Sequence, residues 1–245
     1  MQFSKSAMVS FLLLAAACSS TTTVTTTDGG TGTDAGKDVA VKDTGTTPDG
    51  SGGSCKPQDV SGFAPSTDPG PATAAGACTD QVALDYYNAC IDPGDTTACT
   101  ALGKDTTKAA CLKCLSTPDT DAKWGALVED SQNLIRNNIA GCLAVKGDAA
   151  CAKAISESSQ CTRAACPDTV CPVPDGDSAA LDALNKCESD SEKLGCKKYA
   201  DVALCADTTD GGSAAAKACT APANSTDDFK DTYLAVAHVI CVTGN

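Results

Sequence analysis

The sequence predicts an all-α fold in which disulfides staple helical hairpins together. The main observation is a spacing of Cys-x8-Cys that occurs three times, at Cys90–Cys99, Cys142–Cys151 and Cys187–Cys196. Each copy follows apolar residues at helical spacing and is followed by a further cysteine, which is typical of degenerate repeats. The second observation is composition, because seventeen cysteines accompany only 4% aromatic residues and one tryptophan. A core made mostly of alanine and cysteine is thin, so we expect disulfides formed in an oxidising compartment to stabilise it.

The N-terminus predicts a signal peptide over residues 1–17. Lys5 precedes an apolar run and three alanines, and this stretch is too short for a mature transmembrane helix. The residues Leu14-Ala15-Ala16-Ala17-Cys18 resemble the lipobox of bacterial lipoprotein precursors. The resemblance implies cleavage before Cys18, lipidation of its thiol and, with Ser19 next, passage to the outer membrane. Ordinary secretory cleavage at the Ala-x-Ala site is the alternative.

The number of cysteines supports lipidation independently of the motif. If Cys18 carries a lipid, sixteen of the seventeen cysteines remain, and an even number can pair completely. Residues 18–54 are almost entirely Thr, Gly, Asp and Ser, so they cannot bury enough apolar surface to fold and predict a disordered tether. Four prolines make residues 55–77 a loop-like segment, and residues 78–245 are expected to form a cysteine-rich helical domain.

Apolar periodicity and caps place the helices of this domain. A helix is expected after a Thr79 cap up to Cys90, and a second from Thr100 toward Cys114. The strongest periodicity predicts one long helix over residues 122–143. A further helix is expected behind a Ser178 cap, and a closing helix over residues 226–242, which places Phe229, Tyr233, Val236 and Ile240 on one face.

The repeat pattern also predicts a set of disulfides. Bridges at the turns are expected to be Cys90–Cys99, Cys142–Cys151 and Cys187–Cys196. Bridges at the open ends are expected to be Cys78–Cys111, Cys114–Cys161 and Cys171–Cys205. No partner is assigned to Cys55, Cys166, Cys219 or Cys241.

Few residues in the sequence suggest chemistry. The motif from Cys111 to Cys114 is a CxxC, but it lies late in an expected helix without a βαβ pattern, which favours permanent bridges over thiol exchange. A zinc site would need a second CxxC, and the series Cys161, Cys166 and Cys171 is spaced too widely. The single histidine, His238, is expected to be exposed, and the carboxylate pairs Asp175/Asp177 and Asp227/Asp228 are interpreted as helix caps. No catalytic residue, metal or cofactor is therefore assigned.

The formal net charge of −13 argues against a nucleic-acid partner, because such binding depends on Lys and Arg at phosphates. The favoured interpretation is a non-catalytic lipoprotein held at a membrane outside the cytoplasm, with an unknown protein or small-ligand partner. The lipobox resemblance implies that this membrane is the bacterial outer membrane. The protein would act as a structural or interaction module. The alternatives are a carrier that holds a small ligand or cation between hairpins, and a thiol-disulfide oxidoreductase that uses Cys111 and Cys114.

Overall fold

A computed structural model of the chain describes residues 55–92, 96–131, 133–174, 177–207, 212–222 and 225–243. The expected signal peptide, the lipidated Cys18 and the tether lie outside these residues. Within the described ranges, no helix combines the length and the apolar character that crossing a membrane requires.

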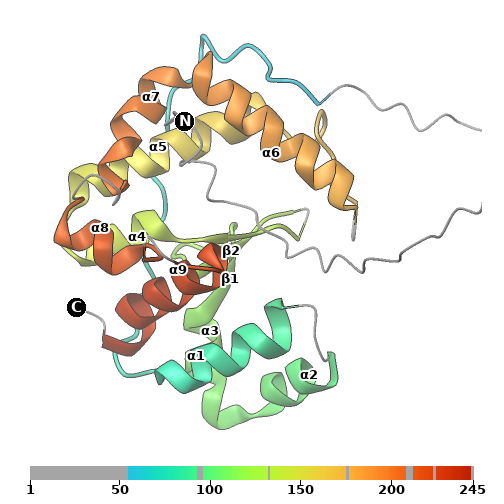
Figure 1. The fold of residues 1–245 in the computed structure, drawn as a ribbon. Helices are drawn as coiled ribbons and strands as arrows, with labels where there is room; N and C mark the ends of the chain where they lie inside the picture. The colour runs from blue at the N-terminus through green and yellow to red at the C-terminus, as the bar shows by residue number, and fades with distance from the viewer. Residues whose placement is uncertain are drawn as a thin grey trace, which may run out of the picture.

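The part of the chain that the structure describes is mostly helical, and its α-helices range from 6 to 17 residues. They are α1 (Asp80–Tyr86), α2 (Thr96–Lys104), α3 (Ala109–Leu115), α4 (Ile139–Val145), α5 (Ala149–Ala165), α6 (Ser178–Lys193), α7 (Lys197–Ala203), α8 (Ala214–Cys219) and α9 (Asp228–Ala237). Short 3-10 or π-helical turns are η2 (Tyr87–Ile91), η3 (Thr106–Lys108), η4 (Leu204–Ala206) and η5 (His238–Thr243). In Figure 1, α5, α6 and α7 lie on one side of the short strands, and α1, α2 and α3 lie on the other.

A small sheet corrects the all-α prediction. Its strands β1 (Ser116–Pro118), β2 (Leu127–Glu129) and β3 (Ile135–Asn137) lie in the order β1-β2-β3. The first pair is parallel and the second is antiparallel, with Val128 opposite Arg136. The predicted long helix over residues 122–143 is therefore wrong, since the chain there forms β2, β3 and then α4.

Close backbone contacts explain why a helix does not form there. A Cβ atom at Gly125 would lie 2.3 Å from the carbonyl oxygen of Cys114, so only glycine fits against the end of α3. The next residue, Ala126, donates its N–H to that same oxygen at 2.9 Å. Asn133 has a φ of 61°, which turns the chain between β2 and β3. Asn138 then caps α4 by accepting a hydrogen bond from the N–H of Gly141 at 2.8 Å.

The predicted ends of other helices agree with the structure more closely. Thr79 caps α1 by accepting from the N–H of Val82 at 3.3 Å. The cap of α6 is Asp177 rather than Ser178, and Asp227 caps α9. These two carboxylates therefore serve as caps, as expected for the acidic pairs; Asp175 lies outside the described residues. The closing helix also forms, because α9 continues into η5.

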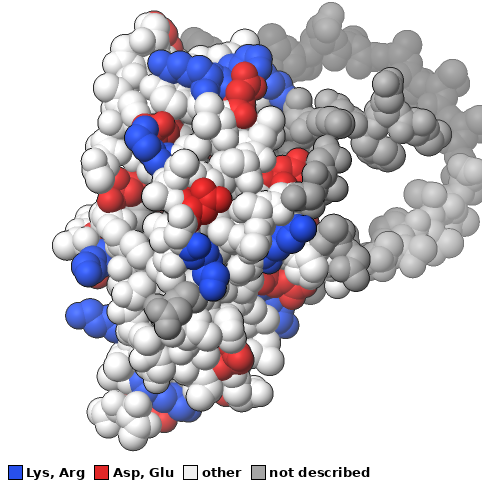
Figure 2. Space-filling model, turned by 90° about the vertical axis from the view of Figure 1, so that its left-hand side faces the viewer, with Lys and Arg blue, Asp and Glu red and all other residues white. Residues whose placement is uncertain are grey.

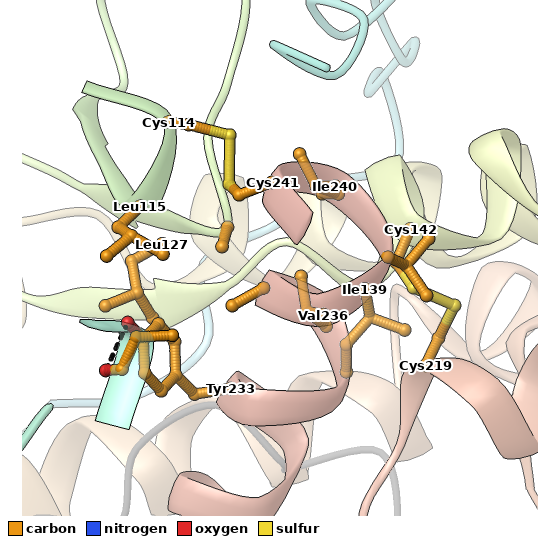
Figure 3. Close-up of a cluster of buried hydrophobic side chains, with 14 of the residues drawn as sticks. Cys114, Leu115, Leu127, Ile139, Cys142, Cys219, Tyr233, Val236, Ile240 and Cys241 are labelled. Carbon is orange, nitrogen blue, oxygen red and sulfur yellow. Dashed lines mark hydrogen bonds between the residues drawn. A yellow bond between two sulfur atoms is a disulfide. The ribbon is translucent and has the colours of Figure 1, made fainter. Parts of the chain in front are cut away.

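Two apolar clusters form the core. The larger includes buried residues of α1, α3, α4, α8, α9 and η5, and it contains Tyr233, Leu115, Leu127, Leu143, Val236 and Ile240. Figure 3 shows its centre, where the bridges Cys114–Cys241 and Cys142–Cys219 flank Val236 and Ile240. Buried at this centre, Tyr233 donates its hydroxyl to the carbonyl oxygen of Ala83 at 3.1 Å. The smaller cluster includes Leu134, Cys161, Ala165, Leu181 and Leu184. Helix α5 contributes to both clusters, so it joins them.

The proline-rich segment forms an extended strap (residues 55–77) across the helical part. Its N-terminal part bonds to the end of α5, with Gln58 N–H to Ala165 oxygen at 2.7 Å. Its middle pairs with Trp124, and its end follows η5, with Gly76 N–H to Val242 oxygen at 2.9 Å. The strap therefore contributes to packing along its whole length.

Eight disulfides join the sixteen cysteines in the described residues. They are Cys55–Cys171, Cys78–Cys111, Cys90–Cys99, Cys114–Cys241, Cys142–Cys219, Cys151–Cys205, Cys161–Cys196 and Cys166–Cys187. Two of them, Cys78–Cys111 and Cys90–Cys99, are pairs expected from the repeat pattern.

The other four expected pairs are wrong. They are Cys142–Cys151, Cys187–Cys196, Cys114–Cys161 and Cys171–Cys205. The cause is visible at α4 and α5, where Cys142 and Cys151 are both buried but face different elements. Cys142 reaches α8 at Cys219, and Cys151 reaches η4 at Cys205. Bridges therefore cross the core, and the second and third units are not hairpins stapled at their turns.

Candidate functional site: a cavity beside the sheet

The two cysteines of the CxxC motif belong to different bridges. Helix α3 begins at Ala109, so Cys111 lies in its first turn and not late in a helix as expected. Cys111 is joined to Cys78, Cys114 is joined to Cys241, and both residues of the motif are buried. A thiol-disulfide mechanism needs a pair that can open and close between its own two sulfurs. Because its two cysteines are bonded to different partners in the core, the motif has a structural role.

The sulfurs of Cys55, Cys171 and Cys187 lie within 4.8 Å of one another. Each of them is already bonded to another sulfur, in the bridges Cys55–Cys171 and Cys166–Cys187. A metal ligand must be a thiolate, so this cluster is two neighbouring disulfides and not a metal site. The series Cys161, Cys166 and Cys171 is likewise divided among three bridges.

His238 is exposed, as expected, and lies at the start of η5. Its Nδ1 atom is 2.8 Å from a carboxylate oxygen of Asp80 in the first turn of α1. Both side chains are largely open to solvent, so the pair links two helices at the surface. Figure 2 shows a face on which basic and acidic side chains are interspersed, without a broad region of one sign.

A cavity between α5, α7, β3 and α4 can accept a ligand. Its volume is about 180 Å³, and residues from the strap and from the segments around residues 204–207 and 220–222 complete its wall. An engineered apolar cavity of about 150 Å³ holds benzene, so this space is large enough for a six-membered ring with one small substituent.

Most of the cavity wall is apolar. The larger apolar residues of the lining are Trp124, Val128, Ile139, Ile155, Leu204 and Pro222. Trp124 is half-buried, and its indole N–H donates to the carbonyl oxygen of Asp119 at 3.0 Å, which fixes the ring. Sites with mainly apolar walls and a few polar groups are typical of small-molecule binding.

Two arginines supply the positive charge of the wall. Arg136 projects from β3 and pairs with a carboxylate oxygen of Asp130 at 2.8 Å, and both side chains are about nine-tenths buried. The Nε atom of Arg136 has no hydrogen-bond partner among the described residues. Arg163 lies on α5, and its pKa is lowered by burial first and by the charge of Arg136 second. Its guanidinium forms no hydrogen bond or ion pair with any residue that the structure describes.

Acidic residues of the wall are partly neutralised. The carboxylate of Asp68 accepts hydrogen bonds from Ser156 and, at 2.7 Å, from Gln160. Burial first, and the charge of nearby Glu188 second, raise the pKa of Glu192 from 4.5 to about 7. Glu188 is itself buried, and desolvation raises the pKa of its carboxyl. At neutral pH, Glu192 is therefore only partly ionised.

No family model, curated protein or solved structure matches the chain.

No sequence motif predicted the cavity. Three of its residues do belong to rare types, because Arg136 and Arg163 are the only arginines among eighteen Lys and Arg residues, and Trp124 is the only tryptophan. All three line the same cavity. Arginine is better suited than lysine to buried, forked hydrogen bonding, so a sequence rich in lysine that places both of its arginines at one site is informative.

Proposed function

We propose that the protein is a non-catalytic binding protein, anchored outside the cytoplasm by a lipid on Cys18, whose helical head carries a small organic ligand. The cavity of about 180 Å³ is the observation that supports this function most strongly. Between the interpretations that the sequence left open, the cavity favours a small-ligand carrier over a purely structural module.

The disulfides support the compartment. Eight bridges among the described residues favour an oxidising environment, which is typical of compartments outside the cytoplasm. All sixteen cysteines from Cys55 onward are paired, so Cys18 is the one cysteine left over, as the lipobox resemblance implies. The oxidoreductase alternative receives no support, because Cys111 and Cys114 lie in separate buried bridges.

Binding in the cavity can be tested with three ring-sized probes that are transparent at the wavelengths of tryptophan fluorescence: cyclohexanecarboxylate, cyclohexylmethanol and cyclohexylmethylamine. Because Trp124 is the only tryptophan and lines the cavity, we expect at least one probe to change its fluorescence saturably. Titration calorimetry on the full chain checks the same binding.

A filled cavity provides the control. Ala140 on α4 lines the space, whereas Ala144 on the same helix is exposed. We expect Ala140→Leu to weaken binding of the probes at least tenfold and Ala144→Leu to leave it unchanged, because only the first adds atoms to the cavity. Absence of saturable binding by all three probes would contradict the proposed function.

The anchor has a separate test. A Cys18→Ala variant expressed in a Gram-negative bacterium should leave the membrane fraction, because two or three acyl chains are needed for stable anchoring. The control is Ser20→Ala, which should remain with the membranes. Membrane retention of Cys18→Ala, measured by fractionation and immunoblotting, would rule out lipidation at this residue.

A further inference from the structure

The polar groups of the cavity distinguish among possible ligands. On α5, Arg163 and Ser158 both line the space, and Ser158 is only 1% exposed. The hydroxyl of Ser158 has no hydrogen-bond partner among the described residues. A buried hydroxyl or charge without a partner costs free energy, so both groups favour a ligand that supplies an acceptor.

Arg163 differs from Arg136 in having no direct counter-ion. Asp130 already pairs with Arg136, and their ion pair occupies one side of that guanidinium. The charges that act on Arg163 belong to groups that form no ion pair with it. They include Asp68, Glu188 and the repelling Arg136. A forked guanidinium binds a carboxylate through two parallel hydrogen bonds, and such charge-assisted bonds are stronger in a partly buried site.

The acidic side chains of the wall do not cancel this preference. Both oxygens of Asp68 accept hydrogen bonds from other side chains, so part of the acceptor capacity of this carboxylate is already used. Asp207 has an interaction of its own, and Asp228 lies in the first turn of α9, where the positive end of the helix dipole offsets part of its negative charge. Glu192, with a pKa of about 7, carries only part of a charge at neutral pH.

We propose that the ligand is a small monocarboxylate with a compact apolar body, whose carboxylate meets Arg163 and Ser158 while the body lies against Trp124 and Ile155. This inference rests on the proposed function, because it names the ligand class of the same cavity. The volume restricts the body to roughly the size of one six-membered ring, by comparison with the cavity that holds benzene.

The experiment compares the same three probes, which share a ring and differ in charge. Cyclohexanecarboxylate should bind the full chain at least tenfold more tightly than cyclohexylmethanol, and cyclohexylmethylamine should bind most weakly. Arg163→Gln should remove most of the advantage of the carboxylate and leave the affinity for the alcohol within about twofold. The matched control is Lys153→Gln, because Lys153 lies on the exposed face of the same helix. It should change neither affinity.

A further variant separates charge from geometry. Arg163→Lys keeps the charge but loses the forked donor pair, so it should retain less than half of the advantage of the carboxylate. If the alcohol or the amine binds the unaltered protein as tightly as the carboxylate, the ligand class is overturned while the proposed function stands. If none of the three binds, both are overturned. The comparison on the unaltered protein decides these outcomes even where a variant does not fold.

Discussion

Glu192 lies on α6 one turn beyond Glu188, and both carboxyls are partly or fully removed from water. Residues four apart on a helix are neighbours, so the two carboxylates repel each other when both are ionised. Burial has the larger effect on the pKa of Glu192, the charge of Glu188 adds to it, and Lys193 opposes it. The result is a carboxyl that titrates near neutral pH in the wall of the cavity.

This titration predicts a pH dependence of stability. Because the pKa of Glu192 rises from 4.5 to about 7 on folding, the folded state holds its proton where the unfolded state has lost it. The free energy of unfolding should therefore decrease as the pH rises from 4.5 to 7 and should change little from this group above 7. Glu192→Gln, which mimics the neutral form, should be more stable than the unaltered protein at pH 8, and the difference should shrink toward pH 4.5.

Melting temperatures measured across this pH range check the prediction. Asp182→Asn is the control, because Asp182 lies on the same helix but is exposed. The Asp182→Asn variant should keep the decrease in stability between pH 4.5 and 7 that the unaltered protein shows. Equal pH profiles for the unaltered protein and Glu192→Gln would show that this carboxyl does not titrate as stated.

At the scale of elements, helical periodicity predicted the first and last helices of the helical domain correctly, but it did not predict the strands between them. The closing helix was predicted with Phe229, Tyr233, Val236 and Ile240 on one face, and all four are buried. The capped start of α1 was also predicted, because a cap depends on residues that are adjacent in sequence. These elements follow from local spacing alone.

The strands could not be predicted in this way. The apolar residues of 122–143 satisfy a helical stripe, but the backbone there bonds to α3 and to the strap. The N–H of Trp124 donates to the oxygen of Gly70 at 3.1 Å, and the N–H of Ala126 donates to the oxygen of Cys114 at 2.9 Å. Such partners are distant in sequence, and tertiary contacts of this kind override local propensity.

The cavity could not be predicted from local sequence either. Its wall combines the strap, the sheet, α4, α5, α6 and the segment after α7, so no local motif encodes it. Sequence reasoning anticipated a carrier only as an alternative, and it placed the ligand between hairpins. One signal in the sequence could have pointed to the cavity, namely the scarcity of arginine and tryptophan. The single tryptophan, Trp124, and the two arginines, Arg136 and Arg163, all line this space.

At the scale of the whole molecule, disulfides connect helices that are far apart in the chain. The bridge Cys114–Cys241 joins α3 to η5 across 127 residues, whereas Cys90–Cys99 spans only 9. The bridge Cys142–Cys219 lies within the longer loop and shortens the path through it. The path that remains is about 50 residues, still several times the length of the local loop.

This difference predicts unequal losses of stability. In the chain-entropy model, closing a path of about 50 residues contributes roughly 4 kcal/mol, whereas a loop of about ten contributes roughly 2.7 kcal/mol. Cys114 and Cys241 are also only 2% and 0% exposed, so their removal leaves space in the core, whereas Cys90 and Cys99 are half-buried. We therefore expect the double variant Cys114→Ala/Cys241→Ala to lose more free energy of unfolding than Cys90→Ala/Cys99→Ala, by at least ~1 kcal/mol.

Urea denaturation of the two double variants under non-reducing conditions measures the difference, and thiol titration verifies that the remaining bridges are intact. The pair Cys90→Ala/Cys99→Ala is the matched control, because it also removes one bridge and two sulfurs. An equal or larger loss for this control would mean that local turns stabilise the head more than the bridges across its core. The expected order instead assigns the greater stabilisation to the bridge that joins the closing helix to α3, and so to the cluster around Tyr233, Val236 and Ile240 that this bridge encloses.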